Sequence, residues 1–303
     1  MIGFLNIDKP AGMGSRLVTT RLSYKLRPAK VGHIGTLDPL ATGVLVLAVG
    51  KATRLAELLH STPKSYVGEF LWNRRSNTED IEGEVSEVSH APVTREKVEA
   101  ALPAFRGEIL QTPPAFSAKW VNGQRAYKLA RRGRDVALPP KAVQVHTLEV
   151  CDATPEAFRL KIACGTGTYI RSLGRDIAAA CGGSAVMSSL RRTAVGPFHA
   201  KDAVSLNAVE ESPTECLLPA SMVTTGMPEL VLNEDEIRPV LDGRPVPRPG
   251  LAAEQLAFLD GEGELVAVGR AEDGWAKPGT VVRMRDGRRM SESARRAARE
   301  KHG

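Results

Sequence analysis

The chain of 303 residues lacks the features of a metal-bound, disulfide-linked or membrane-spanning protein. None of its four cysteines forms a CxxC pair or has a histidine at ligand spacing, so we predict buried, reduced thiols and no zinc site. The N-terminus has no basic stretch followed by an apolar one, and the longest apolar run, Val44 to Val49, is too short to cross a bilayer. We therefore expect a cytoplasmic protein without membrane contact.

Positive charge is concentrated at one end of the chain. The formal net charge is +6, but residues 283–303 alone hold eight Lys and Arg against three Asp and Glu, a net of +5. The rest of the chain is thus close to neutral, and the overall charge is weak support for nucleic-acid binding. Any RNA-binding surface has to be local.

The predicted elements indicate an α+β protein with a mixed or antiparallel sheet, because strands and helices do not alternate strictly. Ser15 is expected to cap the first helix. Residues 30–35 and 74–83 are expected to be loops. We predict helices at 15–27, 52–59, 94–105, 126–132 and 169–181, and strands at 44–49, 66–72, 143–150 and 158–164.

Turn-forming pairs become frequent in the last third of the chain, as at Asp242-Gly243 and Asp273-Gly274. This pattern predicts a small all-β domain. The expected organisation is a catalytic domain at 1–227, an all-β domain at 228–284 and a basic tail at 285–303, helical or disordered.

Asp38 precedes a proline in a segment flanked by Gly35 and Gly43. Alone, this pattern is typical of a turn residue or a helix cap. Its interpretation changes because further blocks of the chain supply residues suited to chemistry at a glycosidic bond.

Six blocks in the same order resemble the TruB family of tRNA pseudouridine synthases, in its bacterial type, and the resemblance covers nearly the whole chain. The C-terminal segment loosely resembles a PUA-like RNA-binding module. The six blocks are DKPAGM at 8–13, GHIGTLDPLATG at 32–43, KSY at 64–66, QTPPAFSAK with GQRAY at 111–127, GTYIRSL at 167–173 and LRRT at 190–193.

The resemblance implies conversion of uridine to pseudouridine at position 55, in the T-loop of tRNA. This reaction breaks the N1–C1′ bond, rotates the uracil and joins C5 to C1′. No atom enters or leaves and no electron is transferred, so no cofactor or metal is expected. The sequence has no dinucleotide fingerprint, P-loop or metal-ligand cluster, in agreement with this expectation.

On this resemblance Asp38 is the nucleophile. A desolvated carboxylate tends to protonate, so it needs a neighbouring cation, for which Arg171 is the candidate. Tyr66 is expected to stack on the extruded uracil and to serve as a general base. Without the family context, Arg171 would be read as a surface charge and Tyr66 as a core residue at a strand end.

Other residues are expected to bind the RNA. Tyr169 closes the base pocket, Leu190 contacts the base or simply belongs to the core, and His33 braces the gap left by the flipped base or is a loop histidine. Lys9 and Lys64 come from matching blocks. Phosphate contacts are expected from a basic cluster, whose alternative is a solvated helix face: Lys119, Arg125, Lys128, Arg131, Arg132 and Arg134.

The chain departs from the family pattern in a few places. Asn77 stands where the family usually has an aspartate, which puts any ionic role there in doubt. Gly14 and Arg16 are unusual in the first block, and Phe116 replaces a common tyrosine. None of these changes affects Asp38, Tyr66 or Arg171.

Three other functions compete with this one. The same chemistry could act on another RNA, or the chain could mainly bind and fold tRNA. A retaining glycosidase is a third possibility, but it needs a second carboxylate that no motif supplies. The expected partner is the T-arm of tRNA, with no protein partner implied and a monomeric state.

Overall fold

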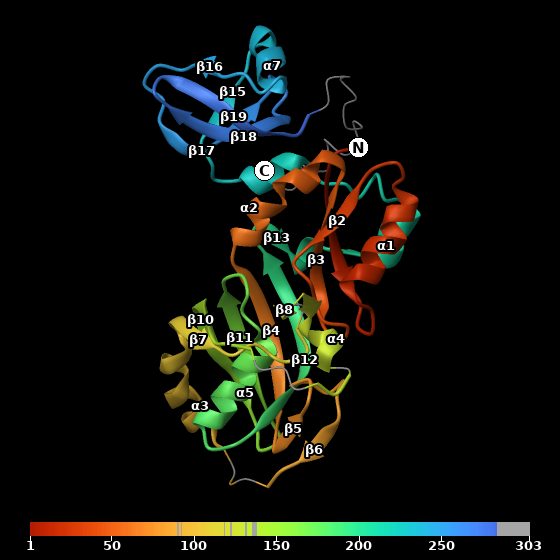
Figure 1. Ribbon diagram of the computed structural model, residues 1–303, viewed down its shortest axis with the longest axis vertical. Coiled ribbons are helices and arrows are strands. Elements are labelled where there is room, and N and C mark those ends of the chain that lie inside the picture. The colour runs from red at the N-terminus through yellow and green to blue at the C-terminus, as the bar shows by residue number, and fades with distance from the viewer. Residues whose placement is uncertain are drawn as a thin grey trace. The chain divides into compact units, whose positions relative to one another are not determined.

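The computed structural model describes residues 1–283 except 90, 92, 118, 122, 131 and 135–137, so the predicted basic tail lies outside the described residues (Figure 1). The chain forms two compact units. The first comprises Met1–Pro39, Gly43–His60 and Gly196–Gly303, and the second Leu40–Thr42 and Ser61–Val195. No described helix is long and apolar enough to cross a membrane.

The second unit is built on an antiparallel sheet in the order β12-β4-β11-β10-β7. The central strand β4 pairs with β11 on one side and β12 on the other. The sheet strands are β4 (Lys64–Trp72), β7 (Gly107–Gln111), β10 (Lys141–Ala153), β11 (Ala157–Cys164) and β12 (Ala185–Val195). The other elements are β5 (Arg74–Ser76), β6 (Val85–Glu87), α3 (Arg95–Ala101), η2 (Leu102–Phe105), β8 (Trp120–Val121), β9 (Gln124–Arg125), α4 (Ala126–Ala130) and α5 (Ile170–Ala180).

Helix α5 runs across one face of this sheet (Figure 1). Its buried stripe includes Leu173 and Ile177, as its sequence pattern predicts. Gly174 allows close approach, because a Cβ there would lie only 2.0 Å from a ring carbon of Phe70. The helix ends in a Schellman motif, in which Gly183 N donates to Ala178 O at 2.9 Å.

The first unit contains a smaller sheet in the order β14-β1-β3-β2. Strand β1 pairs antiparallel with β3 and parallel with β14, so the predicted mixed character of the sheet is confirmed. The elements are β1 (Gly3–Lys9), α1 (Ser15–Lys25), β2 (Val31–Ile34), β3 (Thr42–Val49), η1 (Gly50–Leu55), α2 (Ala56–Ser61), β13 (Phe198–His199), η3 (Ala200–Asp202), β14 (Val204–Ser205), α6 (Leu206–Glu211) and η4 (Ala220–Thr224).

The C-terminal segment forms its own five-stranded sheet in the order β15-β17-β18-β19-β16. Its core is apolar and includes the fully buried Leu256, Phe258 and Val266. One helix, α7, adds to the predicted β structure, and its Val240 is fully buried in the same core. The elements are β15 (Glu229–Val231), α7 (Glu234–Leu241), β16 (Val246–Pro247), β17 (Ala253–Leu259), β18 (Leu265–Glu272) and β19 (Trp275–Val281).

The prediction of buried thiols was wrong for three of the four cysteines, since only Cys164 is buried. Three predictions of local structure were also wrong. Residues 31–34 form β2, because they pair with β3, and residues 74–76 form β5, because they pair with β6. Gly14, not Ser15, occupies the N-cap of α1. The Ser15 hydroxyl instead bonds Leu37, donating to its carbonyl at 3.0 Å and accepting from its N–H at 2.8 Å. A tertiary contact has therefore replaced the expected local cap.

Candidate active site

The loop that carries Asp38 connects β2 to β3 and is held on both sides of the aspartate. Leu37 is bonded through both backbone groups to the buried Ser15 hydroxyl. Pro39 O accepts hydrogen bonds from Gly12 N at 2.8 Å and from Lys9 Nζ at 3.2 Å. The N-terminal block therefore fixes the backbone on both sides of Asp38. This fixes the point from which the Asp38 side chain projects.

Lys9 was predicted to bind substrate, but the structure places its side chain inside the loop. It is fully buried, and its ammonium also donates to Pro10 O at 2.8 Å and Met13 O at 2.6 Å. A buried cation is tolerated when hydrogen bonds of this kind replace its hydration. Lys9 thus links the N-terminal block to the loop that carries Asp38 and helps to hold that loop in place.

His33 lies on β2 and is hydrogen-bonded at both ring nitrogens. Its Nδ1 lies 3.0 Å from Thr19 Oγ1, and its Nε2 lies 3.4 Å from Thr36 Oγ1. The Thr19 hydroxyl donates its only proton to Ser15 O at 2.8 Å. Because that oxygen can then only accept from the ring, the pattern assigns the proton of His33 to Nδ1. The imidazole is held in one tautomer and one orientation.

In the second unit, one face of the sheet brings several predicted residues together. Tyr66 and Gly68 are two apart on β4, and the register places Arg192 opposite Tyr66 and Leu190 opposite Gly68. Residues two apart on a strand, and residues directly opposite, share a face. Tyr66 and Leu190 therefore lie on the same side of the sheet as α5.

The N-terminal end of α5 covers this face. A Cβ on Gly68 would lie 3.5 Å from Ile170 Cγ2. The preceding residue, Tyr169, is fixed by the buried side chain of Gln111, which accepts from Tyr169 N at 2.8 Å and donates to Tyr169 O at 3.0 Å. The side-chain amide of Gln111 thus binds the backbone of the N-cap residue of α5. Sequence analysis did not predict this contact.

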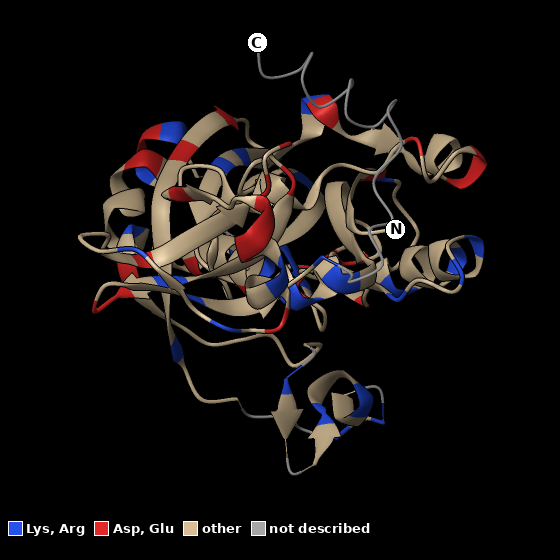
Figure 2. Ribbon diagram, turned by 90° about the horizontal axis from the view of Figure 1, so that it is seen from above, with Lys and Arg blue, Asp and Glu red and all other residues tan. Residues whose placement is uncertain are grey.

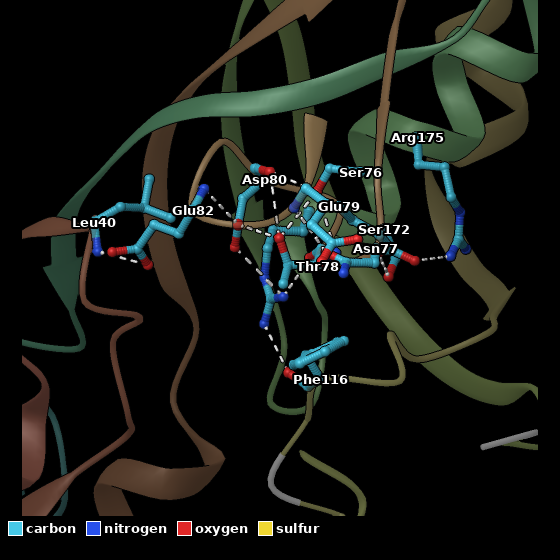
Figure 3. Close-up of polar contacts among 12 residues, drawn as sticks. Leu40, Ser76, Asn77, Thr78, Glu79, Asp80, Glu82, Phe116, Ser172 and Arg175 are labelled. Carbon is cyan, nitrogen blue, oxygen red and sulfur yellow. Dashed lines mark hydrogen bonds and ion pairs between the residues drawn. The ribbon is translucent and has the colours of Figure 1, made fainter. Parts of the chain in front are cut away.

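Arg171 follows in the first turn of α5 and is 6% exposed. Its Nη1 donates to Thr78 O at 2.6 Å and lies 3.5 Å from Asp80 Oδ2, and its Nη2 donates to Phe116 O at 3.2 Å. Asp80 is itself buried and accepts from Glu82 N at 3.0 Å (Figure 3). Arg171 therefore has a buried carboxylate partner that sequence analysis did not single out.

The turn that carries Asp80 is tied to α5 a second time. Glu79 adopts a left-handed backbone with φ of 64°, which is uncommon outside glycine. Its carboxylate accepts from Ser172 Oγ at 2.6 Å and pairs with Arg175 (Figure 3). Burial raises the pKa of Glu79, and the bonds from Ser172 and Arg175 oppose that shift. These contacts hold the turn against the helix next to Arg171.

The role of Asn77 is now defined by its contacts. Its Oδ1 accepts from Glu84 N at 3.1 Å. Gly83 is needed beside it, because a Cβ there would lie 2.3 Å from that oxygen. An amide oxygen accepts such a hydrogen bond as a carboxylate oxygen does. Asn77 in place of the family's usual aspartate therefore preserves this hydrogen bond of the turn but carries no charge.

Lys64 begins β4, two residues before Tyr66, and is only 6% exposed. It donates to Thr62 O at 2.6 Å and to Thr166 Oγ1 at 2.8 Å. Burial, together with the charge of Arg192, lowers the pKa of Lys64 to about 8, although Cys164 opposes the shift. Its charge therefore changes close to neutral pH.

Of the predicted basic cluster, Arg125 lies on β9 and Lys128 on α4, whereas Lys119 precedes β8 and Arg132 and Arg134 follow α4; Arg131 is outside the described residues. Residues 109–134 contain no Asp or Glu. On α3 and α7, by contrast, Lys and Arg are interspersed with Asp and Glu, and Figure 2 shows both signs of charge on the described part of the chain. Trp120 is 63% exposed, and the guanidinium of Arg125 lies 4.4 Å from its ring centroid. Burial and the charge of Lys141 lower the pKa of Lys119.

Among the described residues, no group of three or more His, Cys, Asp or Glu side chains is arranged to hold a metal ion. Asp38 belongs to the first unit, whereas Tyr66, Tyr169, Arg171 and Leu190 belong to the second.

Comparison with solved structures gives the fold class. A crystal structure of a Cbf5-Nop10-Gar1 complex matches with a TM-score of 0.72 and 26% identity, covering 94% of this chain and 86% of that one. The archaeal box H/ACA sRNP Nop10-Cbf5 complex matches with a TM-score of 0.68 and 25% identity, covering 94% and 87%.

Sequence comparison is more specific. Residues 23–170 match the model of the TruB family pseudouridylate synthase N-terminal domain, and 171–220 match that of the tRNA pseudouridylate synthase B C-terminal domain. Proteins named tRNA pseudouridine synthase B from Ruegeria pomeroyi and Aquifex aeolicus are 39% and 36% identical to this chain. Each match covers 92% of it, and 95% and 98% of the relative, respectively.

Fold and sequence together define the protein as a pseudouridine synthase, an enzyme of the isomerase class. Within that class, the chain belongs to the TruB family.

Proposed function

We propose that this protein converts uridine 55 in the T-loop of tRNA to pseudouridine, with Asp38 as the nucleophile. The main support is that the relatives named tRNA pseudouridine synthase B align over 92% of the chain. The six sequence blocks support the same substrate, and they include the whole stretch from Gly32 to Gly43 around Asp38.

The Asp38 carboxylate attacks the flipped-out nucleotide covalently, and the N1–C1′ bond breaks. The uracil turns so that C5 faces C1′, and the C5–C1′ bond forms. The proton on C5 leaves, N1 gains a proton, and the carboxylate is released. Atoms and electrons balance without a redox partner.

In this proposal Arg171 keeps Asp38 ionised in a desolvated site. Asp80, Thr78 O and Phe116 O already hold the guanidinium, so it need not reorganise when the base enters. Preorganisation of this kind is the feature of the second unit that best supports catalysis.

Tyr66 and Leu190 share one sheet face, which suits them to bind the two sides of a flat uracil. Tyr66 also accepts the proton that leaves the sugar or base. Tyr169 closes the pocket, and its backbone is fixed for that task by Gln111. His33, with its ring orientation fixed, fills the space that the flipped base leaves.

Lys64 and the predicted basic cluster around Lys119 bind phosphates. We revise the expectation for Lys9 from substrate contact to positioning of the Asp38 loop, because its ammonium is bonded to three carbonyls.

Residues 228–284 form a PUA-like RNA-binding domain in this proposal. The protein acts as a cytoplasmic monomer.

The test is incubation with an unmodified tRNA transcript, followed by carbodiimide treatment and primer extension. A new stop at position 55, and nowhere else in the tRNA, is expected. A stop elsewhere in the tRNA, or a stop only on a ribosomal RNA transcript treated in parallel, would mean the same chemistry on another target. No new stop, together with tight tRNA binding, would favour the rival function of a tRNA-folding protein.

A further inference from the structure

The outer face of α1 carries charge of one sign. Between Asp8 and Asp38 the sequence has six Lys and Arg and no Asp or Glu. Lys9 is buried in the loop described above, but the other five are exposed on α1 or directly after it. They are Arg16, Arg21, Lys25, Arg27 and Lys30.

Most of these charges are not neutralised by the protein. Arg21 pairs with Glu210 of α6 at 2.6 Å. In the described part of the chain, no carboxylate lies within ion-pair distance of Arg16, Lys25, Arg27 or Lys30. Exposed arginines elsewhere do have partners, such as Arg159 with Glu69 at 2.8 Å. Unpaired cations side by side repel one another unless an anion binds them.

An exposed aromatic ring lies among these cations. Tyr24 is 62% exposed, and the guanidinium of Arg27 lies 4.6 Å from its ring centroid. Leu17 on the same helix is 52% exposed. Cations around an exposed aromatic ring are the arrangement that binds a nucleic-acid backbone together with an unpaired base.

The position of α1 connects this face to the proposed site. Thr19 of α1 contacts the ring of His33 at 3.0 Å. Arg16 and Ser23 are three and four residues from Thr19, so they flank it along the helix. An RNA that reaches His33 therefore comes close to Arg16 on the same helix.

We propose that the outer face of α1 binds the phosphate backbone of the substrate RNA, with Tyr24 stacking on an unpaired base beside it. This inference rests on the proposed function, since it takes His33 to face the RNA. Arg16, Lys25, Arg27 and Lys30 supply the phosphate contacts, and Arg21 is largely neutralised by Glu210.

The test measures binding of the full chain to an unmodified tRNA transcript across a range of KCl concentrations. The double variant Arg16→Gln/Arg27→Gln is compared with Lys97→Gln/Lys161→Gln, which removes two exposed cations from the second unit. Each lost phosphate contact lowers the slope of log K against log salt by about 0.7 to 0.9. We expect a slope smaller by about 1.5 and a Kd raised about tenfold for the first pair only.

Two further variants sharpen the result. Glu210→Gln frees Arg21 and should tighten tRNA binding. Tyr24→Ala should weaken binding whereas Tyr24→Phe should not, because stacking needs the ring and not the hydroxyl. Identical salt slopes for the two double variants would overturn the proposal.

The same variants separate this inference from the proposed function. If the wild-type protein binds tRNA but forms no pseudouridine, and Arg16→Gln/Arg27→Gln still weakens binding, the surface is real and the proposed activity is wrong. If pseudouridine forms and the variant binds tRNA normally, the activity stands and the surface proposal fails. If Arg16→Gln/Arg27→Gln binds tRNA normally but no longer sediments with phosphatidylglycerol vesicles as the wild type does, the face binds membranes instead of RNA, and the proposal fails.

Discussion

Arg171 Nη1 lies 3.5 Å from Asp80 Oδ2, and both side chains are almost completely buried. The pair joins the first turn of α5 to the turn between β5 and β6. Thr78 O and Phe116 O bind the same guanidinium, which fixes its plane as well as its position (Figure 3). A cation held by three groups can stabilise a further anion without first reorganising.

Asp80→Asn should slow catalysis. The amide can still accept from Glu82 N but no longer balances the charge of Arg171. We expect kcat to fall about 10- to 100-fold, which corresponds to about 1.4 to 2.7 kcal/mol of activation free energy, with little change in KM. Single-turnover pseudouridine formation measures the effect.

Asn77→Asp is the matched control in the same turn. The Asn77 side chain is exposed, and a carboxylate would accept equally well from Glu84 N. Its kcat should stay within about twofold of wild type, since surface changes of this kind have small effects. If the two variants are equally slow, the turn is merely sensitive to any change and the Arg171–Asp80 pair has no particular role.

Lys64 should make RNA binding depend on pH. The structure lowers its pKa to about 8 from the usual 10.5, chiefly through burial. The charged form therefore prevails below pH 8, and affinity for tRNA should fall as the pH rises through 8. In Lys64→Arg the charge persists, so that fall should disappear. Titration of Kd from pH 6.5 to 9.5 decides this, and a flat wild-type profile would argue against a phosphate contact.

The same shift predicts how stability depends on pH. Between pH 8 and 10.5 the unfolded chain binds a proton at Lys64 that the folded protein has released. The free energy of unfolding should therefore rise with pH across this window, by up to about 3 kcal/mol at 1.36 kcal/mol per pKa unit. Lys64→Met should lack that rise, which urea unfolding at several pH values would detect.

Gly174→Ala should destabilise the second unit. The added Cβ would lie 2.0 Å from the ring of Phe70, so the helix or the ring has to move. Overpacking of this kind costs about 1 to 3 kcal/mol. Gly165→Ala is the control, because its nearest contact would be an ordinary 3.4 Å. Combining Gly174→Ala with Phe70→Leu should recover part of the loss, and additive losses would contradict the steric explanation.

Sequence could predict the elements with strong periodicity and the residues that lie in distinctive blocks. The buried stripe of α5 and the strands β4 and β11 follow from apolar patterns alone. The partners of Arg171 and Tyr169 could not be found in this way, since Asp80 and Gln111 are distant from them in sequence and no local pattern pairs them. The T-x-D spacing at Thr78 and Asp80 is the one signal in the sequence that points to Asp80.

Tertiary contacts also account for the local errors. Ser15 has the right chemistry for a helix cap, yet it bonds Leu37 beside the predicted nucleophile. Residues 31–34 look like a glycine-rich loop but complete a strand beside β3. Lys9 resembles a substrate-binding lysine in a loop block, and only the fold shows that it is buried. Each of these depends on a pairing that local propensity does not encode.

The most direct test of the account is a single-turnover measurement of pseudouridine at position 55 of tRNA by the wild-type protein and Asp38→Asn. The account predicts complete conversion by wild type and none by the variant, with tRNA affinity unchanged. Asp152→Asn, an exposed aspartate on β10, should behave as wild type. Conversion by Asp38→Asn at the wild-type rate would contradict the assignment of Asp38 as the nucleophile.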